Sequence, residues 1–198
     1  MIFTGEYDSP VGRLFIAVSG NAVTGLWIEG QKYFFRTLTE APHPAPSHPL
    51  IMKTQEWLDR YFSGEYPSPS ELPLYPDGSQ FRHDVWDILL TIPYGGITTY
   101  GDIAKALAAR TGKNVSAQAV GGAVGHNPIS ILIPCHRIVG ADGSLTGYAG
   151  GLDKKLWLLR HENVDIDIVT RRNSALPKVR FCDKLQMEIK TEERTGTL

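Results

Sequence analysis

The chain has 198 residues, of which 42% are hydrophobic and 21% charged, a composition typical of a globular protein with a packed core. No run of 18 or more apolar residues occurs, which argues against a transmembrane helix. The N-terminus also lacks the basic and apolar regions of a signal peptide. We therefore expect a cytoplasmic protein without membrane contact.

The formal net charge of −1 argues against a strongly basic nucleic-acid binder, but the charge is unevenly distributed. Residues 1–78 carry 5 Lys and Arg against 9 Asp and Glu, residues 79–163 carry 8 against 6, and residues 164–198 carry 7 against 6. If the partner is DNA, the middle segment is expected to bind it through few phosphate contacts. A small positive excess is equally typical of a solvated surface.

Two cysteines, Cys135 and Cys182, are too few for a disulfide framework or for a zinc site built on three or four thiolates. The six histidines are scattered and show no metal-binding spacing. We expect no metal and no cofactor.

The first part of the chain predicts a small unit of strands and one helix. Residues 1–36 have a strand-like pattern, with apolar residues alternating from residue 14 to 18, a second strand over 23–28, and turn signals at 9–12 and 19–21. Residues 50–62 have helical spacing. The proline-rich stretch 67–78 is the best linker candidate.

Beyond residue 78 the pattern predicts helices. One carries the apolar stripe Phe81, Val85, Ile88 and Leu89. Another begins at the capping-box-like sequence 99–102, and a polar turn separates it from a Gly- and Ala-rich helix near Ser116. Such a pair is compatible with helix-turn-helix geometry, although two packed helices without DNA contact are the more common case. Residues 179–189 alternate like strands.

The segment 131–140 is the most informative part of the chain. An apolar, strand-like run leads through Pro134 to Cys135, which is followed at once by His136 and Arg137. Cationic or hydrogen-bonding groups near a thiol favour the nucleophilic thiolate. Adjacent strand residues point to opposite faces, so His136 assists Cys135 only if the backbone turns there. A lone cysteine is otherwise a small buried apolar residue, which is the interpretation favoured for Cys182.

The sequence Pro134-Cys135-His136-Arg137, followed by Val139 and Gly140, resembles the active-site signature of the 6-O-alkylguanine-DNA alkyltransferases. These are the methylated-DNA–protein-cysteine methyltransferases. Other segments resemble the family's asparagine–proline turn, its Gly-rich loop, the helix with its acidic residue and its upstream motifs: 125–129, 145–155, 158–162, 92–95, 99–101 and 9–12. The resemblance extends over residues 1–163.

The resemblance implies an α+β fold. An N-terminal, ribonuclease H-like domain of a small sheet and a helix would span 1–78, and a mostly helical, winged or helix-turn-helix-like domain would span 79–163. Residues 164–198 would form an extension of unknown role. The implied function is DNA repair: a monomer binds double-stranded DNA at the minor groove, flips the alkylated guanine out, and transfers the alkyl group irreversibly to its own cysteine.

The resemblance also assigns roles to residues. Cys135 would accept the alkyl group, while His136 and Glu162 would relay the thiol proton through a water, and Asn127 would hold the active-site turn. Without the resemblance, Glu162 would be interpreted as a solvated residue near a helix end. Arg137 is expected to make structural hydrogen bonds.

A second group is expected to contact the base or the DNA. Tyr100 would donate a hydrogen bond to guanine and lie near a phosphate, Tyr148 would pack on the base, and Lys155 would lie near the leaving oxygen or hold the pocket. A lysine on a helix is otherwise usually solvated. Ala119 and Ile138 complete this group with Gln118, which occupies a position where many family members carry arginine and so brings no charge to the gap left by the flipped base.

Two other functions are compatible with parts of this pattern. A non-catalytic DNA-lesion binder would use the same scaffold, but such relatives lack the acceptor cysteine, which is present here as Cys135. A cysteine hydrolase using Cys135 and His136 would need repeated turnover and an oxyanion hole, for which the sequence shows no signature.

Overall fold

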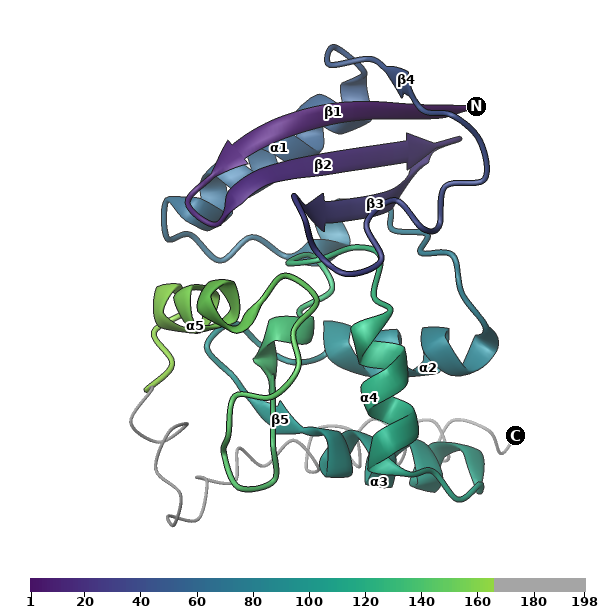
Figure 1. Cartoon of the computed structure of the whole chain (residues 1–198), viewed down its shortest axis with the longest axis vertical. Helices are drawn as coiled ribbons and strands as arrows, with labels where there is room; N and C mark the ends of the chain where they lie inside the picture. The colour runs from purple at the N-terminus through teal and green to yellow at the C-terminus, as the bar shows by residue number, and fades with distance from the viewer. Residues whose placement is uncertain (166–198) are drawn as a thin grey trace, which may run out of the picture.

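The N-terminal part of the protein is a mainly antiparallel sheet covered on one face by a helix (Figure 1). In this computed structural model, which describes residues 1–165, the sheet has the strand order β3-β2-β1-β4. Its strands are β1 (Ile2–Ser9), β2 (Gly12–Ser19), β3 (Ala22–Ile28) and the short parallel strand β4 (His43–Pro44). Helix α1 (Pro49–Phe62) packs against β1 and β2. The alternation at 14–18 and the turns at 9–12 and 19–21 therefore predicted the hairpins correctly.

The strand-like pattern predicted for the first 36 residues extends too far. The strands end at Ile28, and turns occupy most of the next ten residues, where Phe34 and Phe35 pack on Trp27. These aromatic side chains cover the outer face of the sheet. Residues in turns can do this as well as residues in a strand, so the apolar pattern extends beyond the strands.

The proline-rich connection lies along the edge of β3 that faces away from β2. It contains the 3-10 helix η1 (Pro69–Glu71), and the β3 residue Val23 exchanges backbone hydrogen bonds with it, donating to the Pro73 carbonyl and accepting from the Tyr75 amide. Further along the same edge, the Leu26 amide donates to the Pro128 carbonyl, and the Leu26 carbonyl accepts from the Ser130 amide. Pairing of this edge thus joins the sheet to the second half of the chain.

The second half is mostly helical. It contains α2 (Gln80–Leu90), α3 (Tyr100–Thr111), α4 (Ala117–Gly125) and α5 (Leu152–His161), with the 3-10 helix η2 (Cys135–Arg137) and the parallel two-residue strands β5 (Thr98–Thr99) and β6 (Ile138–Val139). Helix α4 packs against both α2 and α3. The hydroxyls of Thr99 and Ser116 cap α3 and α4. The cap at Thr99 and the helix start near Ser116 were both predicted from the sequence. Phe81 departs from its predicted apolar stripe because it is exposed, whereas Val85, Ile88 and Leu89 are buried.

One hydrophobic core runs through both halves and includes Ile16 of the sheet, Trp86 of α2 and Cys135. Among the described residues, no helix has the length and apolarity needed to cross a membrane. The predicted strands at 179–189 and Cys182 lie outside the described residues.

Candidate active site around Cys135

The turn that follows α4 is organised by the side chain of Asn127. Its Oδ1 accepts a hydrogen bond from the Ile129 amide at 3.0 Å, and its Nδ2 donates to the Ile133 carbonyl at 2.8 Å and to Cys135 Sγ at 3.1 Å. Asn127 is buried, so these partners replace the water that its amide would otherwise bind. One side chain therefore fixes the loop and the thiol together.

The strand expected before Cys135 is absent. Residues 131–133 form a tight loop, with Ile131 at a φ of 71°, and Cys135 begins η2. The loop is apolar because Ile131, Leu132 and Ile133 are buried in the core, and Asn127 draws the loop carbonyls inward. Adjacent residues of a strand point to opposite faces, but the backbone turns at Cys135, so this limit does not apply to Cys135 and His136. Both residues are buried.

Burial raises the pKa of the Cys135 thiol, while the Asn127 hydrogen bond and the nearby Lys155 charge oppose that rise. At neutral pH the sulfur is therefore protonated at rest. Nucleophilic attack by this sulfur requires a base that removes the proton.

The imidazole of His136 is fully buried, and its Nε2 lies 2.7 Å from Glu162 Oε1. Burial lowers the pKa of His136, although the Glu162 carboxylate acts in the opposite direction, so the ring is neutral near pH 7. A carboxylate acceptor at Nε2 holds the ring proton there, which leaves Nδ1 with its lone pair. Nδ1 is buried and has no hydrogen-bond partner within the described residues, so it is available as the base.

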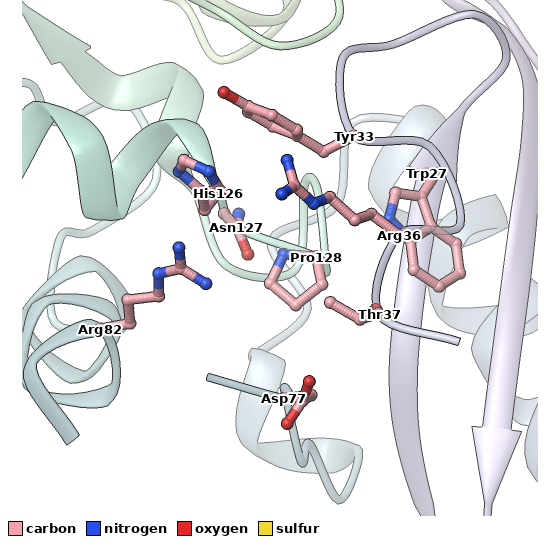
Figure 2. A pocket seen from close by; sticks show the side chains of 9 residues that line it. All are labelled: Trp27, Tyr33, Arg36, Thr37, Asp77, Arg82, His126, Asn127 and Pro128. Carbon is pink, nitrogen blue, oxygen red and sulfur yellow. The ribbon is translucent and has the colours of Figure 1, made fainter. Parts of the chain in front are cut away.

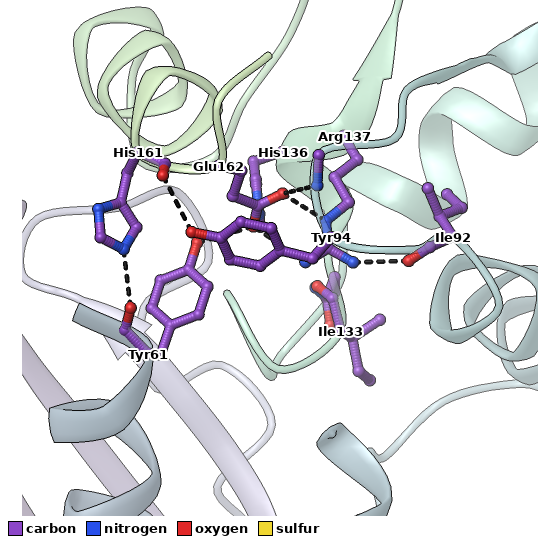
Figure 3. Close-up of polar contacts among 10 residues, drawn as sticks. Tyr61, Ile92, Tyr94, Ile133, His136, Arg137, His161 and Glu162 are labelled. Carbon is purple, nitrogen blue, oxygen red and sulfur yellow. Dashed lines mark hydrogen bonds and ion pairs between the residues drawn. The ribbon is translucent and has the colours of Figure 1, made fainter. Parts of the chain in front are cut away.

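The Glu162 carboxylate accepts five hydrogen bonds and lies beside Arg137 (Figure 3). Its Oε1 accepts from His136, from the Tyr61 hydroxyl at 2.8 Å and from Arg137 Nη2 at 2.9 Å. Its Oε2 accepts from Arg137 Nε at 2.7 Å and from the Gly95 amide at 3.3 Å. Burial alone would raise the pKa of Glu162, but His136 and Arg137 hold it well below its usual range. The solvated alternative for Glu162 is therefore wrong.

Arg137 makes the structural hydrogen bonds expected of it. Besides Glu162, its Nη1 donates to the Ile92 carbonyl at 2.6 Å, and the side chain is 9% exposed. Its neighbour Ile138 is buried in β6, where strand pairing with Thr98 brings the chain after Cys135 beside the start of α3.

Lys155 is fully buried, which excludes the solvated alternative. Its Nζ donates to the carbonyls of Ile138 at 2.5 Å and Thr146 at 2.7 Å, joining α5, β6 and the Gly-rich loop. Burial lowers the pKa of Lys155 to about 8, and the nearby Cys135 acts in the opposite direction. A cation at this position favours a thiolate at Cys135.

The Gly-rich loop also carries Tyr148, which packs against the core. Burial raises its pKa well above the usual value, and the charges of Cys135 and Glu162 add to the rise. Gly150 permits this packing, since a Cβ there would lie 2.9 Å from both the Tyr148 ring and Ile28 Cδ1. Across the loop, the hydroxyl of Tyr100 lies 3.4 Å from the Thr146 carbonyl.

The exposed face of α4 presents a surface of small and polar residues. Gln118, Ala119 and Gly122 are exposed, and a Cβ added at Gly122 would meet no atom within 4 Å. This surface contains little that would keep another backbone at a distance.

A separate cavity of about 230 Å³ is lined in part by Asn127 and its neighbours His126 and Pro128 (Figure 2). Arg36, Arg82 and His126 line it together with Tyr33, whose ring stacks on His126 at 4.2 Å. Asn127 lines this cavity and also binds Cys135, but Cys135 is not part of the lining. Within residues 1–165, no group of three or more His, Cys, Asp or Glu side chains is placed to hold a metal ion.

Tyr61 is the site residue that sequence reasoning missed. It lies within the segment 50–62, whose helical spacing accounts only for its ring, and that ring is buried. Nothing in that pattern indicates that its hydroxyl reaches a carboxylate 101 residues later.

The fold and the site together define a class: a small sheet domain joined to a helical domain that holds a buried thiol beside an imidazole–carboxylate pair. Residues 2–76 match the ribonuclease-like domain, and residues 80–164 the DNA-binding domain, of 6-O-methylguanine DNA methyltransferases. The chain belongs to the 6-O-methylguanine DNA methyltransferase family, as its motifs predicted, and the predicted α+β fold is confirmed.

Relatives agree with this assignment. The chain is 43% identical over 162 residues to the methylated-DNA–protein-cysteine methyltransferase of Haemophilus influenzae, covering 80% of this chain and 84% of that protein. Mycobacterium tuberculosis O6-methylguanine methyltransferase is 40% identical, with a TM-score of 0.68 and coverage of 82% and 93%. A structure of Mycobacterium tuberculosis OGT in complex with DNA is 38% identical, with a TM-score of 0.69 and coverage of 85% and 97%.

Proposed function

We propose that the protein repairs DNA by transferring the alkyl group of a 6-O-alkylguanine to Cys135 Sγ. The observation that carries this proposal is the contact set of Cys135, with Asn127 on the sulfur and a neutral His136, oriented by Glu162, next along the chain. The family membership and the DNA complex of a relative support it.

In the proposed reaction, the thiol proton leaves towards His136 Nδ1 as the sulfur attacks the alkyl carbon. The S–C bond forms while the C–O6 bond breaks, and guanine leaves with the electron pair of that bond and takes up one proton. Glu162 stabilises the transient imidazolium, and the Lys155 cation favours the thiolate. The product is a thioether, which has no easily displaced group, so each molecule reacts once.

The alkylated atom lies within the base stack, so the nucleotide must leave the duplex to reach a buried sulfur. We propose that α4 enters the minor groove with its exposed small residues, that Gln118 occupies the space of the flipped base, and that Tyr100 and Tyr148 contact the base. The protein acts as a monomer with two domains, 1–78 and 79–163.

Intact-mass measurement tests the chemistry, the stoichiometry and the site. After incubation with a duplex holding one 6-O-methylguanine, the protein is expected to gain the mass of one methyl group, and the Cys135→Ala variant to gain none. Repeated turnover, or a methyl group located elsewhere by peptide mapping, would contradict the proposal.

A further inference from the structure

Tyr61 connects the N-terminal sheet-and-helix unit to the imidazole–carboxylate pair. Its hydroxyl donates a hydrogen bond to Glu162 Oε1 at 2.8 Å, and the same oxygen accepts the bond from His136 Nε2 at 2.7 Å. Tyr61 lies on α1, so this contact joins two distant parts of the chain at the oxygen that orients the base.

The surroundings of Tyr61 fix the position of its hydroxyl. The ring is 1% exposed and lies nearly parallel to Trp57, with ring centroids 5.5 Å apart. The backbone carbonyl of Tyr61 accepts from His161 Nε2 at 2.7 Å (Figure 3). Tyr61 therefore holds two consecutive residues at the end of α5, one through its backbone and one through its hydroxyl.

We infer that Tyr61 is a positioning residue for the alkyl transfer, which acts through Glu162: its hydroxyl shares Oε1 with His136 and takes up part of the carboxylate charge that acts on the imidazole. This inference rests on the proposed function. The N-terminal unit thereby helps to set the basicity of His136, although its sheet carries no residue of the proposed chemistry.

The other groups around Glu162 determine in which direction the pKa of His136 changes when the Tyr61 hydroxyl is removed. Arg137 binds both carboxylate oxygens, so the carboxylate remains ionised and in place when the Tyr61 hydroxyl is removed. Its negative charge then acts more strongly on His136, which stabilises the imidazolium and raises the pKa of His136. The remaining titratable and charged groups near this pair are unchanged by the substitution: Tyr94, His161, Lys155, Cys135 and Tyr148.

The test is the pH dependence of methyl transfer from a duplex with one 6-O-methylguanine, followed by rapid quenching and intact mass. In Tyr61→Phe, the acid limb of the pH–rate profile, where the rate falls because His136 is protonated, is expected to move to higher pH by about half a unit. The rate on this limb is then several-fold lower than in the wild type at the same pH. Tyr7→Phe is the matched control. Tyr7 lies on β1, and its hydroxyl donates to the carboxylate of Asp59 on α1 at 2.7 Å, outside the site. The pH profile of Tyr7→Phe is therefore expected to coincide with that of the wild type.

A purely structural role for Tyr61 would lower stability without moving the limb. Coincident Tyr61→Phe and wild-type profiles, or an equal shift in Tyr7→Phe, would overturn the inference. A wild-type protein that gains no methyl group would instead refute the proposed function. If Tyr61→Phe does not fold, 3-fluorotyrosine at position 61 keeps the ring and donates more strongly, so the limb is expected to move down; an unchanged limb would also overturn the inference.

Discussion

Replacing Glu162 with Gln tests the central ion pair of the site. The substitution keeps the shape of the side chain but removes its charge. Both carboxylate oxygens of Glu162 act as acceptors, and together they accept five hydrogen bonds. An amide has one acceptor oxygen, so its NH₂ group must face either Arg137 or the His136 and Tyr61 donors. Arg137 also stays buried without a counter-ion. We expect a loss of about 3–5 kcal/mol in the free energy of unfolding, a large share of a typical domain's stability.

The loss should depend on pH in a defined direction. The folded-state pKa of Glu162 is depressed, so the stability it contributes is fully present above its unfolded pKa of about 4.3. It is lost as the pH falls towards the folded pKa. The difference between wild type and Glu162→Gln should therefore be largest near neutral pH and should shrink below about pH 4.

Urea denaturation followed by tryptophan fluorescence measures this difference, since Trp27 and Trp86 are buried. The double variant Glu162→Gln with Arg137→Met should cost less than the sum of the two single variants, because it leaves no unpaired charge. Methyl transfer should slow by about 100-fold or more, since His136 loses the group that orients it. A stability loss below about 1 kcal/mol, or additive single costs, would refute this reasoning.

Three further substitutions test other parts of the site. Asn127→Ala should destabilise the fold by about 2–4 kcal/mol and raise the pKa of the Cys135 thiol, since Nδ2 no longer donates to it; denaturation and thiol titration measure the two effects, and an unchanged thiol pKa would contradict the assigned contact. The folded-state pKa of Lys155 is lowered to about 8, so wild-type stability relative to Lys155→Met should rise as the pH increases from about 8 to about 10.4; a flat difference across that range would count against buried, charged Lys155. Gln118→Arg should tighten duplex binding and steepen its salt dependence, and equal affinity with an equal slope would contradict a DNA contact at position 118.

Much of the fold was predictable because it depends on local patterns. Alternating apolar residues predicted β2, an apolar run predicted β3, and helical spacing predicted α1, α2 and α3. Thr99 and Ser116 marked helix starts because their hydroxyls cap free backbone amides. The apolar pattern of residues 131–133 wrongly predicted a strand. These residues are buried because they fill the core as a loop.

The sequence by itself determined the family and the identity of the thiol and its neighbours, because the motif around Cys135 is contiguous in the chain. Only the tertiary structure decided that Glu162 and Lys155 are buried, because a charged side chain at a helix reveals its burial only through its partners, and those partners come from distant segments. The same reason hid Tyr61, whose hydroxyl meets Glu162 only when α1 packs against the end of α5. Sequence patterns specify which faces are apolar, whereas packing decides which polar atoms those faces bring together.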